Sequence, residues 1–285
     1  MAPAESTTRV AALQLCATPD VAGNLATVQR LARQARERGA EVIMLPEAFA
    51  FLGPERDKQA VLEPLPDPAA AGADFTPGPI LEFCQTLARE LDAHLILGGF
   101  HETAPEPGKS FNTCVHLDPA GRLAARYRKI HLFDVSLDDG TELRESKRTM
   151  PGSEAVVSEL PFGALGLTVC YDLRFPYLYQ RLADLGAVAL TVPSAFTRPT
   201  GAAHWHVLLR ARAIETQCYV IAPAQHGQNW EKRASYGHSL IIDPWGEVVD
   251  ELDDGDGMVM ADIDPARVAA VRRQLPSLTH RVSVR

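Results

Sequence analysis

Residues 165–182 read LGLTVCYDLRFPYLYQRL, an apolar run that gives way to a polar turn and then to an amphipathic segment. This pattern predicts a short strand over residues 165–169 and a helix from about Pro176. Cys170 stands where the strand becomes the turn, close to backbone N–H groups and to the start of a helix. We expect this position to favour the thiolate and to lower the thiol pKa from its ordinary value of about 8.5. A buried, unreactive cysteine is the alternative, but the charged neighbours Asp172 and Arg174 favour chemistry.

Composition places the chain among ordinary globular proteins and argues against several classes of partner. Its 285 residues are 46% hydrophobic and 22% charged, with a net charge of −8 and no basic stripe. Nucleic acid or an anionic membrane is therefore not expected as the main partner, and no apolar run approaches the roughly 18 residues of a membrane helix. The N-terminal MAPAESTTRV lacks the pattern of a signal peptide. Five scattered cysteines without a CxxC pair favour a reducing cytoplasm.

Apolar periodicity along the rest of the chain predicts an α+β fold. In the first part, strands at residues 8–15, 41–45 and 94–100 alternate with helices at 25–38 and 80–91. After the Cys170 stretch, further strands flank a helix at 203–217, and hairpins lie between and after the two alternating parts. This order favours two mixed sheets packed together and covered by helices.

The sequence gives no sign that the chain is divided into several domains. Without a linker or a sequence repeat, residues 1–285 are expected to form one domain, with a short helix at 266–274 and a C-terminal arm at 276–285. A loop-like segment at 48–79 is long enough to suggest a functional loop or a lid.

A catalytic thiol needs a base and a group that stabilises an oxyanion, and two other strand ends offer them. Glu47 follows the apolar run VIMLP, so partial burial is expected to raise its pKa and make it a general base near neutral pH. Lys129, in YRKIH at the end of a hairpin strand, could lower the thiol pKa and stabilise a tetrahedral oxyanion. From spacing alone, Glu47 could also be a surface acid, and Lys129 could belong to a solvated edge with Arg126 and Arg128.

Other polar residues leave more than one interpretation open. Glu145 lies in the loop LRESKRTMPG, where spacing alone favours a surface acid. Asp172 and Arg174 could pair with each other, or Arg174 could bind a substrate carboxylate through two hydrogen bonds. His204 and His206 are two residues apart on a helical stretch, so they point to different sides and a shared metal is not expected. The sequence contains no GxGxxG before a helix, P-loop, HExxH or GxSxG motif.

Three motifs in this order, MLPEAF, YRKIHLFD and CYDLRFP, resemble those of the nitrilase superfamily of carbon–nitrogen hydrolases. The similarity extends over nearly the whole chain, including ESKRTMPG, KRASYGHS and DPWGEVV. It implies a four-layer αββα sandwich that forms a homodimer or a higher homo-oligomer. It also implies that Cys170 is the nucleophile, Glu47 the general base, Lys129 the cation at the tetrahedral intermediate and Glu145 a second active-site acid. No metal and no organic cofactor is implied.

Within the superfamily, LLRARAIETQCYV and EKRASYGHS most resemble the branch of deaminated glutathione amidases. The implied reaction hydrolyses the amide between a 2-oxoglutaryl unit and Cys-Gly through a thioester acyl-enzyme. The implied substrate-binding groups are Arg174 for a carboxylate, the backbone N–H of Tyr171 for the oxyanion, and Thr200 in the loop PSAFTRPTG. His206 departs from the pattern, which has Glu at this position, so substrate choice is left more open than the chemistry.

The same residues could serve other substrates. An omega-amidase acting on 2-oxoglutaramate and an N-carbamoyl amino acid hydrolase are the nearest alternatives, and a nitrilase fits less well because this branch is associated with amides. A non-catalytic scaffold on the same fold is the alternative from another class. It is disfavoured because a scaffold has no need to keep a thiol, a lysine and two acids.

Overall fold

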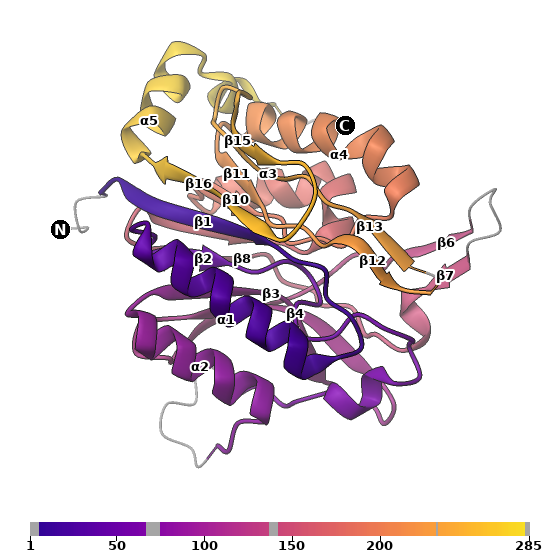
Figure 1. Ribbon diagram of the computed structural model, residues 1–285. Coiled ribbons are helices and arrows are strands. Elements are labelled where there is room, and N and C mark those ends of the chain that lie inside the picture. Colours follow the sequence, from indigo (N-terminus) through magenta and orange to yellow (C-terminus); the bar gives the residue numbers. More distant parts are fainter. Residues whose placement is uncertain (1–5, 67–74, 137–141, 232, 283–285) are drawn as a thin grey trace.

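The computed structural model describes residues 6–66, 75–136, 142–231 and 233–282, and its centre is a pair of large sheets that face each other (Figure 1). The first sheet has the strand order β16-β1-β2-β3-β4-β5 and the second the order β15-β14-β11-β10-β9-β8. The strands of the first sheet are β1 (Thr8–Gln14), β2 (Val42–Met44), β3 (His94–Thr103), β4 (Ser110–Leu117), β5 (Leu123–Arg128) and β16 (Gly257–Ile263). Those of the second are β8 (Val156–Leu160), β9 (Gly163–Leu167), β10 (Ala189–Thr191), β11 (Tyr219–Ala222), β14 (Ser239–Ile242) and β15 (Val248–Leu252).

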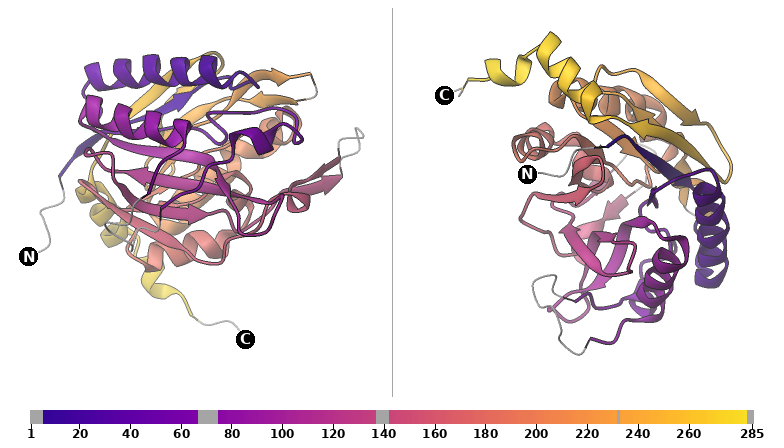
Figure 2. Two further views of the ribbon diagram at one scale, coloured as in Figure 1. Left: turned by 90° about the horizontal axis from the view of Figure 1, so that it is seen from below. Right: turned by 90° about the vertical axis from the view of Figure 1, so that its left-hand side faces the viewer.

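Helices cover the outer face of each sheet (Figures 1 and 2). They are α1 (Val21–Glu37) and α2 (Pro79–Leu91) on the first sheet, α3 (Pro176–Asp184) and α4 (Arg198–Thr216) on the second, and α5 (Pro265–Gln274) after β16. The expected α+β fold, a four-layer αββα sandwich, is therefore confirmed. Within the described part of the chain, no helix combines the length and the apolar character needed to cross a membrane.

Alternating side chains on the central strands build two separate cores. Val10 and Ala12 of β1 belong to the core between the sheets, whereas Ala11 and Leu13 pack towards α1 and α2. Successive side chains of a strand point to opposite faces, so a strand covered on both sides must be apolar at every position. This requirement explains the uninterrupted apolar runs that mark the central strands in the sequence.

The two sheets repeat one topology, although the sequence contains no visible repeat. Counted from β16, neighbouring strands pair antiparallel, parallel, parallel, antiparallel and antiparallel. Counted from β8, the second sheet has the same series. A core accepts many apolar sequences of similar volume, so the topology can repeat without a repeat of residues.

Some elements begin earlier than periodicity predicted. The first helix begins at Val21, because Asp20 caps it by accepting a hydrogen bond of 3.1 Å from the N–H of Gly23. The fourth begins at Arg198, because Pro199 is accommodated in a first turn whose N–H groups need no intrahelical partner.

Two short hairpins were not predicted, and neither lies in the main sheets. They are β6 (Asp134–Ser136) with β7 (Glu142–Arg144), and β12 (His226–Trp230) with β13 (Arg233–Tyr236). Both are rich in polar residues, so they lack the apolar alternation that identifies a half-buried strand.

The expected loop and arm are only partly described. The segment 48–79 contains a 3-10 turn, η1 (Lys58–Val61), and its residues 67–74 lie outside the described residues. The arm contains a second such turn, η4 (Ser277–His280), and its residues 283–285 also lie outside them.

Candidate active site

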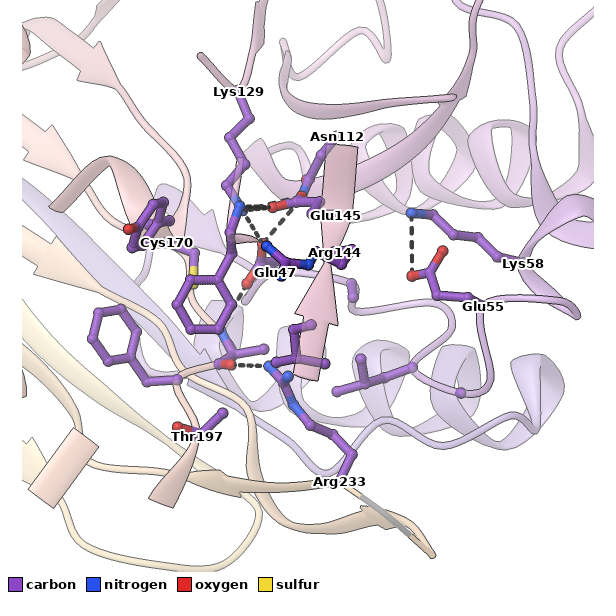
Figure 3. Close-up of a pocket in the computed structure, with 18 of the residues that line it drawn as sticks. Glu47, Glu55, Lys58, Asn112, Lys129, Arg144, Glu145, Cys170, Thr197 and Arg233 are labelled. Carbon is purple, nitrogen blue, oxygen red and sulfur yellow. Dashed lines mark hydrogen bonds and ion pairs between the residues drawn. The ribbon is translucent and has the colours of Figure 1, made fainter. Parts of the chain in front are cut away.

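A cavity of about 610 Å³ lies where chain segments following β2, β5, β9 and β10 meet (Figure 3). Its walls therefore come from both sheets, and residues far apart in the sequence share it. The expected site residues that line it are Glu47, Lys129, Glu145, Cys170, Tyr171, Arg174 and Thr200.

The Lys129 ammonium lies between two carboxylates (Figure 3). Its Nζ is 3.3 Å from Glu47 Oε1 and 2.9 Å from Glu145 Oε2, and its side chain is 2% exposed. Burial by itself lowers the pKa of an amine, but Glu145 and Glu47 outweigh it and raise the pKa of Lys129. Lys129 is thus a fixed buried cation rather than part of a solvated edge.

Glu47 is held by groups from several segments. Its carboxylate accepts hydrogen bonds of 2.9 Å from Asn112 Nδ2 and 2.9 Å from the backbone N–H of Ala195, and it also accepts one from the Cys170 thiol. Burial by itself raises the pKa of Glu47, yet Lys129 and these hydrogen bonds outweigh it and hold the pKa below its ordinary value. The expected rise of this pKa is therefore wrong, because a buried cation contacts the carboxylate.

Glu145 follows β7 and opens a 3-10 turn, η2 (Glu145–Lys147). Besides Lys129, its carboxylate accepts a hydrogen bond of 2.7 Å from the backbone N–H of Phe133. Its side chain is 15% exposed, so Glu145 is not the surface acid that spacing alone favoured.

Cys170 begins a short 3-10 turn, η3 (Cys170–Arg174), three residues after the last residue of β9. Its backbone φ of +48° lies in the left-handed region, which non-glycine residues rarely adopt outside constrained or functional sites. Burial, followed by the charge of Glu47, raises the pKa of its thiol. The expected thiolate is therefore wrong, since burial and the neighbouring Glu47 carboxylate disfavour a negative charge on the sulfur more than Lys129 favours it.

Asp172 fixes the turn that carries Cys170. Its fully buried carboxylate accepts hydrogen bonds of 2.9 Å from the N–H of Val169 and 2.7 Å from the Tyr127 hydroxyl. It also accepts bonds of 3.1 Å from the backbone and 2.6 Å from the ring of His131. Asp172 is thus committed to the turn, and the alternative in which it pairs with Arg174 is wrong.

Arg174 lines the cavity and lies against two aromatic rings. Its guanidinium carbon is 5.9 Å from the ring centre of Tyr171 and 5.4 Å from that of Phe196, and Nη1 is 3.2 Å from His204 Nδ1. Within the described residues it forms no ion pair with a carboxylate. A cation in this state is available to an anionic ligand.

Thr200 and His206 lie on different sides of α4. Thr200 lines the cavity near the start of the helix, where its hydroxyl is 2.8 Å from that of Thr197. His206 contacts Glu251 at 2.7 Å and is not among the described residues that line the cavity. The departure from the family pattern at His206 therefore lies outside the cavity wall.

Two further residues of the cavity were missed in the sequence. Asn112, on β4, donates to Glu47 and lies 3.2 Å from Glu145, and Arg233, on β13, donates to the carbonyl of Ala195. A polar side chain inside the buried strand FNTCVHL was an available signal for Asn112. For Arg233 the signal was the family-like segment KRASYGHS, although periodicity did not reveal the hairpin in which it lies.

Residues 9–273 match the family model described as carbon–nitrogen hydrolase. The chain belongs to this family of carbon–nitrogen hydrolases, as the motifs around Glu47, Lys129 and Cys170 led us to expect.

Individual relatives resemble nearly the whole chain. The deaminated glutathione amidase of Synechocystis is 45% identical over 277 residues, which cover 96% of this chain and 98% of that protein. The human deaminated glutathione amidase is 47% identical over 277 residues, which cover 95% of this chain and 81% of that protein. Among solved structures, the C. elegans NitFhit protein has a TM-score of 0.87 at 37% identity, and the match covers 98% of this chain and 66% of that one. Saccharomyces cerevisiae Nit3, of branch 10 of the nitrilase superfamily, has a TM-score of 0.82 at 29% identity. That match covers 95% of this chain and 94% of Nit3.

Proposed function

We propose that this protein is an amidase that hydrolyses deaminated glutathione to 2-oxoglutarate and the dipeptide Cys-Gly. The meeting of Cys170, Glu47 and Lys129 in one cavity supports amide hydrolysis through a cysteine. The 45% and 47% identity to proteins named deaminated glutathione amidase supports the choice of substrate.

In the first half of the proposed reaction, Cys170 Sγ attacks the amide carbon while Glu47 accepts the thiol proton. Lys129 and the backbone N–H of Tyr171 stabilise the oxyanion that forms, and Glu145 keeps the Lys129 ammonium in place. The C–N bond then breaks. Protonated Glu47 transfers its proton to the leaving nitrogen, which leaves a thioester on Cys170 and releases Cys-Gly.

In the second half, water attacks the thioester carbon and Glu47 accepts a proton from that water. The C–S bond breaks, the proton passes to the sulfur, and 2-oxoglutarate leaves. Because Glu47 is ionised and the thiol neutral at rest, the first half begins with a base and an acid already in hydrogen-bond contact. The second half begins with Glu47 ionised again, because its proton has left with the amine.

The charges around the cavity suit a substrate with a carboxylate at each end. Besides Lys129, the lining includes the cations Lys58, Arg144, Arg174 and Arg233. Lys58 has Glu55 at 3.7 Å and Arg144 has Glu142 at 3.0 Å, whereas Arg174 and Arg233 have no acid partner among the described residues. Arg233 donates a hydrogen bond to the carbonyl of Ala195, which leaves Arg174 without a bond to any oxygen among these residues. Arg174 is therefore the proposed site for one carboxylate, and Thr200, which lines the same cavity, is a second proposed substrate contact.

The decisive assay offers deaminated glutathione and 2-oxoglutaramate side by side. Release of a dipeptide thiol faster than ammonia supports the proposal, and the reverse supports an omega-amidase. Ammonia with CO₂ from N-carbamoyl amino acids would identify the third candidate. Cys170→Ala should abolish turnover with an unchanged circular dichroism spectrum, and an equally active variant would remove the covalent mechanism. Absence of any acyl-enzyme mass across these substrates would favour a scaffold.

We further propose that the chain acts as one domain, forms a homodimer and works in the cytoplasm. A cavity with walls from both sheets needs both halves of the chain. Val207 and Ile214 on α4 are 69% and 47% exposed and offer an apolar face for a second copy. Five unpaired cysteines fit a reducing compartment. Sedimentation of the purified chain tests the dimer.

A further inference from the structure

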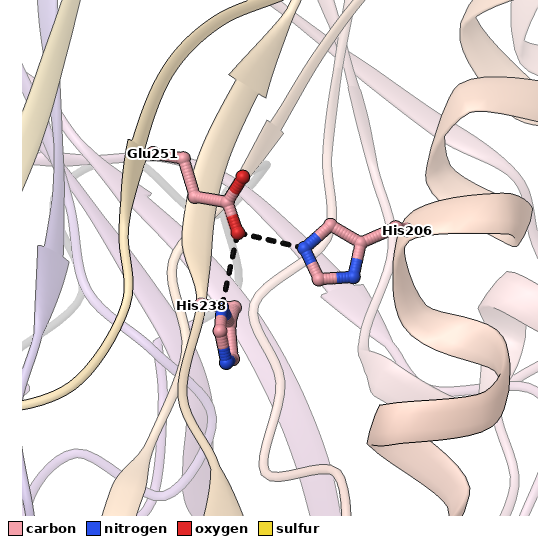
Figure 4. A group of neighbouring side chains, drawn as sticks. All are labelled: His206, His238 and Glu251. Carbon is pink, nitrogen blue, oxygen red and sulfur yellow. Dashed lines mark hydrogen bonds and ion pairs between the residues drawn. The ribbon is translucent and has the colours of Figure 1, made fainter.

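A second cluster of polar side chains lies outside the cavity and plays no part in the proposed reaction (Figure 4). His206 comes from α4, His238 follows β13, and Glu251 comes from β15. Glu251 Oε1 lies 2.7 Å from His206 Nε2 and 3.0 Å from His238 Nδ1. One ligand atom from each residue lies within 4.8 Å of the other two, and all three side chains are partly exposed.

The structure holds both rings in this arrangement. His238 has a φ of +59°, its N–H donates to the carbonyl of Asp253 at 3.1 Å, and its own carbonyl accepts from Trp205 Nε1 at 2.8 Å. The ring of His238 is stacked on that of Tyr236, with centroids 4.3 Å apart. His206 contacts the same Tyr236 edge-on at 6.1 Å. The two imidazoles are thus fixed near Glu251 by contacts that do not involve Glu251.

We propose that His206, His238 and Glu251 bind a Zn²⁺ ion. Two imidazole nitrogens and a carboxylate oxygen are a common ligand set for Zn²⁺, with bonds of about 2.0–2.2 Å, so tetrahedral ligands lie about 3.3 Å apart. The two contacts of Glu251 are already close to that separation. Partial exposure leaves a route for the ion and room for water as a fourth ligand.

The protons balance without any other reactant. In the neutral rings, the nitrogens that face Glu251 carry the protons that they donate to its carboxylate. When Zn²⁺ binds these nitrogens, each ring keeps its proton on the opposite nitrogen, His206 Nδ1 or His238 Nε2. The ion replaces two hydrogen bonds with coordinate bonds, and the carboxylate of Glu251 partly neutralises its charge.

A metal here would join α4, the segment after β13 and β15 at one point, in addition to the hydrogen bonds that already link them. Thr200 on α4 and Arg233 on β13 line the cavity. We therefore infer a structural ion that fixes one wall of the cavity from outside. The inference does not depend on which amide the protein hydrolyses, so a failed substrate assay leaves it intact.

The test titrates the full-length Cys170→Ala protein with Zn²⁺ and Co²⁺, because that variant lacks the cavity thiol as a competing ligand. We expect one ion per chain, the visible absorption of tetrahedral Co²⁺, and a higher Tm in Zn²⁺. His206→Ala and His238→Ala should each weaken Zn²⁺ at least about tenfold, since even the loss of an outer partner of a ligand costs about 10- to 100-fold. Glu251→Gln should weaken it in the same direction.

His226→Ala is the matched control. His226 also lies between two carboxylates, 2.9 Å from Asp254 and 3.0 Å from Asp256, but no second imidazole belongs to that cluster among the described residues. Its loss should leave Zn²⁺ affinity unchanged. The proposal would be overturned by equal Zn²⁺ affinity in all variants, by weaker Zn²⁺ binding in His226→Ala alone, or by the absence of the Co²⁺ absorption. In each case the three side chains would form a hydrogen-bonded cluster without a metal.

Discussion

The side-chain amide of Asn112 donates a hydrogen bond of 2.9 Å to the carboxylate of Glu47. The same nitrogen lies 3.2 Å from Glu145, so one amide on β4 links two acids that also share the Lys129 ammonium. A neutral donor in this position adds hydrogen bonds to both acids without adding charge. For Glu47, this hydrogen bond adds to the charge of Lys129 and favours the ionised carboxylate.

Asn112→Asp should therefore lower kcat/KM by about 100-fold, the scale of losing one preorganised donor in an active site. The variant replaces a donor with a third carboxylate beside one ammonium, which raises the pKa of Glu47. Steady-state kinetics with an unchanged circular dichroism spectrum would check it. Activity within threefold of the parent would show that Asn112 does not support Glu47.

Gly99→Ala should displace the side chain of Glu47, because the backbone of Gly99 leaves no room for a Cβ atom. Gly99 has a φ of +61°, and an added Cβ would lie 2.7 Å from Glu47 Cγ and 2.8 Å from the backbone nitrogen of Ala48. Gly108→Ala is the matched control, because its φ is +79° but an added Cβ there meets no atom within 4 Å. We expect Gly99→Ala to lose at least about tenfold in kcat/KM, since small misplacement of reacting groups is costly. Equal losses in both variants would attribute the effect to backbone strain alone.

Asp172→Asn should destabilise the fold by about 3 kcal/mol, because an amide NH₂ would face groups that all donate. Tyr127→Phe removes only one of these donors, a hydroxyl 2.7 Å from the carboxylate, and should cost about 1–2 kcal/mol. Urea unfolding measures both values. Asp172→Asn as stable as the parent would mean that the carboxylate does not hold the turn of Cys170.

The pH dependence should reflect a carboxylate that is already ionised and a thiol that is not. The pKa of Glu47 lies below its ordinary value of 4.5, so its contribution to stability is present above about pH 4.5 and is lost as the pH falls through the folded-state pKa. Because Glu47 is ionised throughout the range from about pH 5 to about pH 8, its titration should not change kcat/KM there. The pKa of Cys170 is raised, so kcat/KM should not increase as the pH passes through the ordinary thiol pKa of about 8.5 to 9. A tenfold rise per pH unit in that range would show that the thiolate is the form required.

Much of the sandwich was readable from local patterns. Apolar runs such as VAALQL and EVIML identified the central strands, because a strand buried on both faces can carry no polar side chain without a partner. The polar hairpins β6–β7 and β12–β13 were not readable. Their residues contribute to the cavity wall, and no local alternation of apolar and polar residues indicates their pairing.

The sequence by itself determined which residues could carry chemistry, because thiol, ammonium and carboxylate groups stood at the ends of apolar strands in a family-specific order. Only the tertiary structure decided their protonation. Burial alone would neutralise Glu47 and Lys129, whereas contact between them, with Glu145 added, keeps them charged and leaves Cys170 as a neutral thiol. A pKa depends on the distance between charges in space. The Lys129 ammonium lies within 4 Å of both carboxylates only because the chain segments after β2, β5 and β7 meet in the folded protein, and Cys170 reaches the same cavity from the segment after β9.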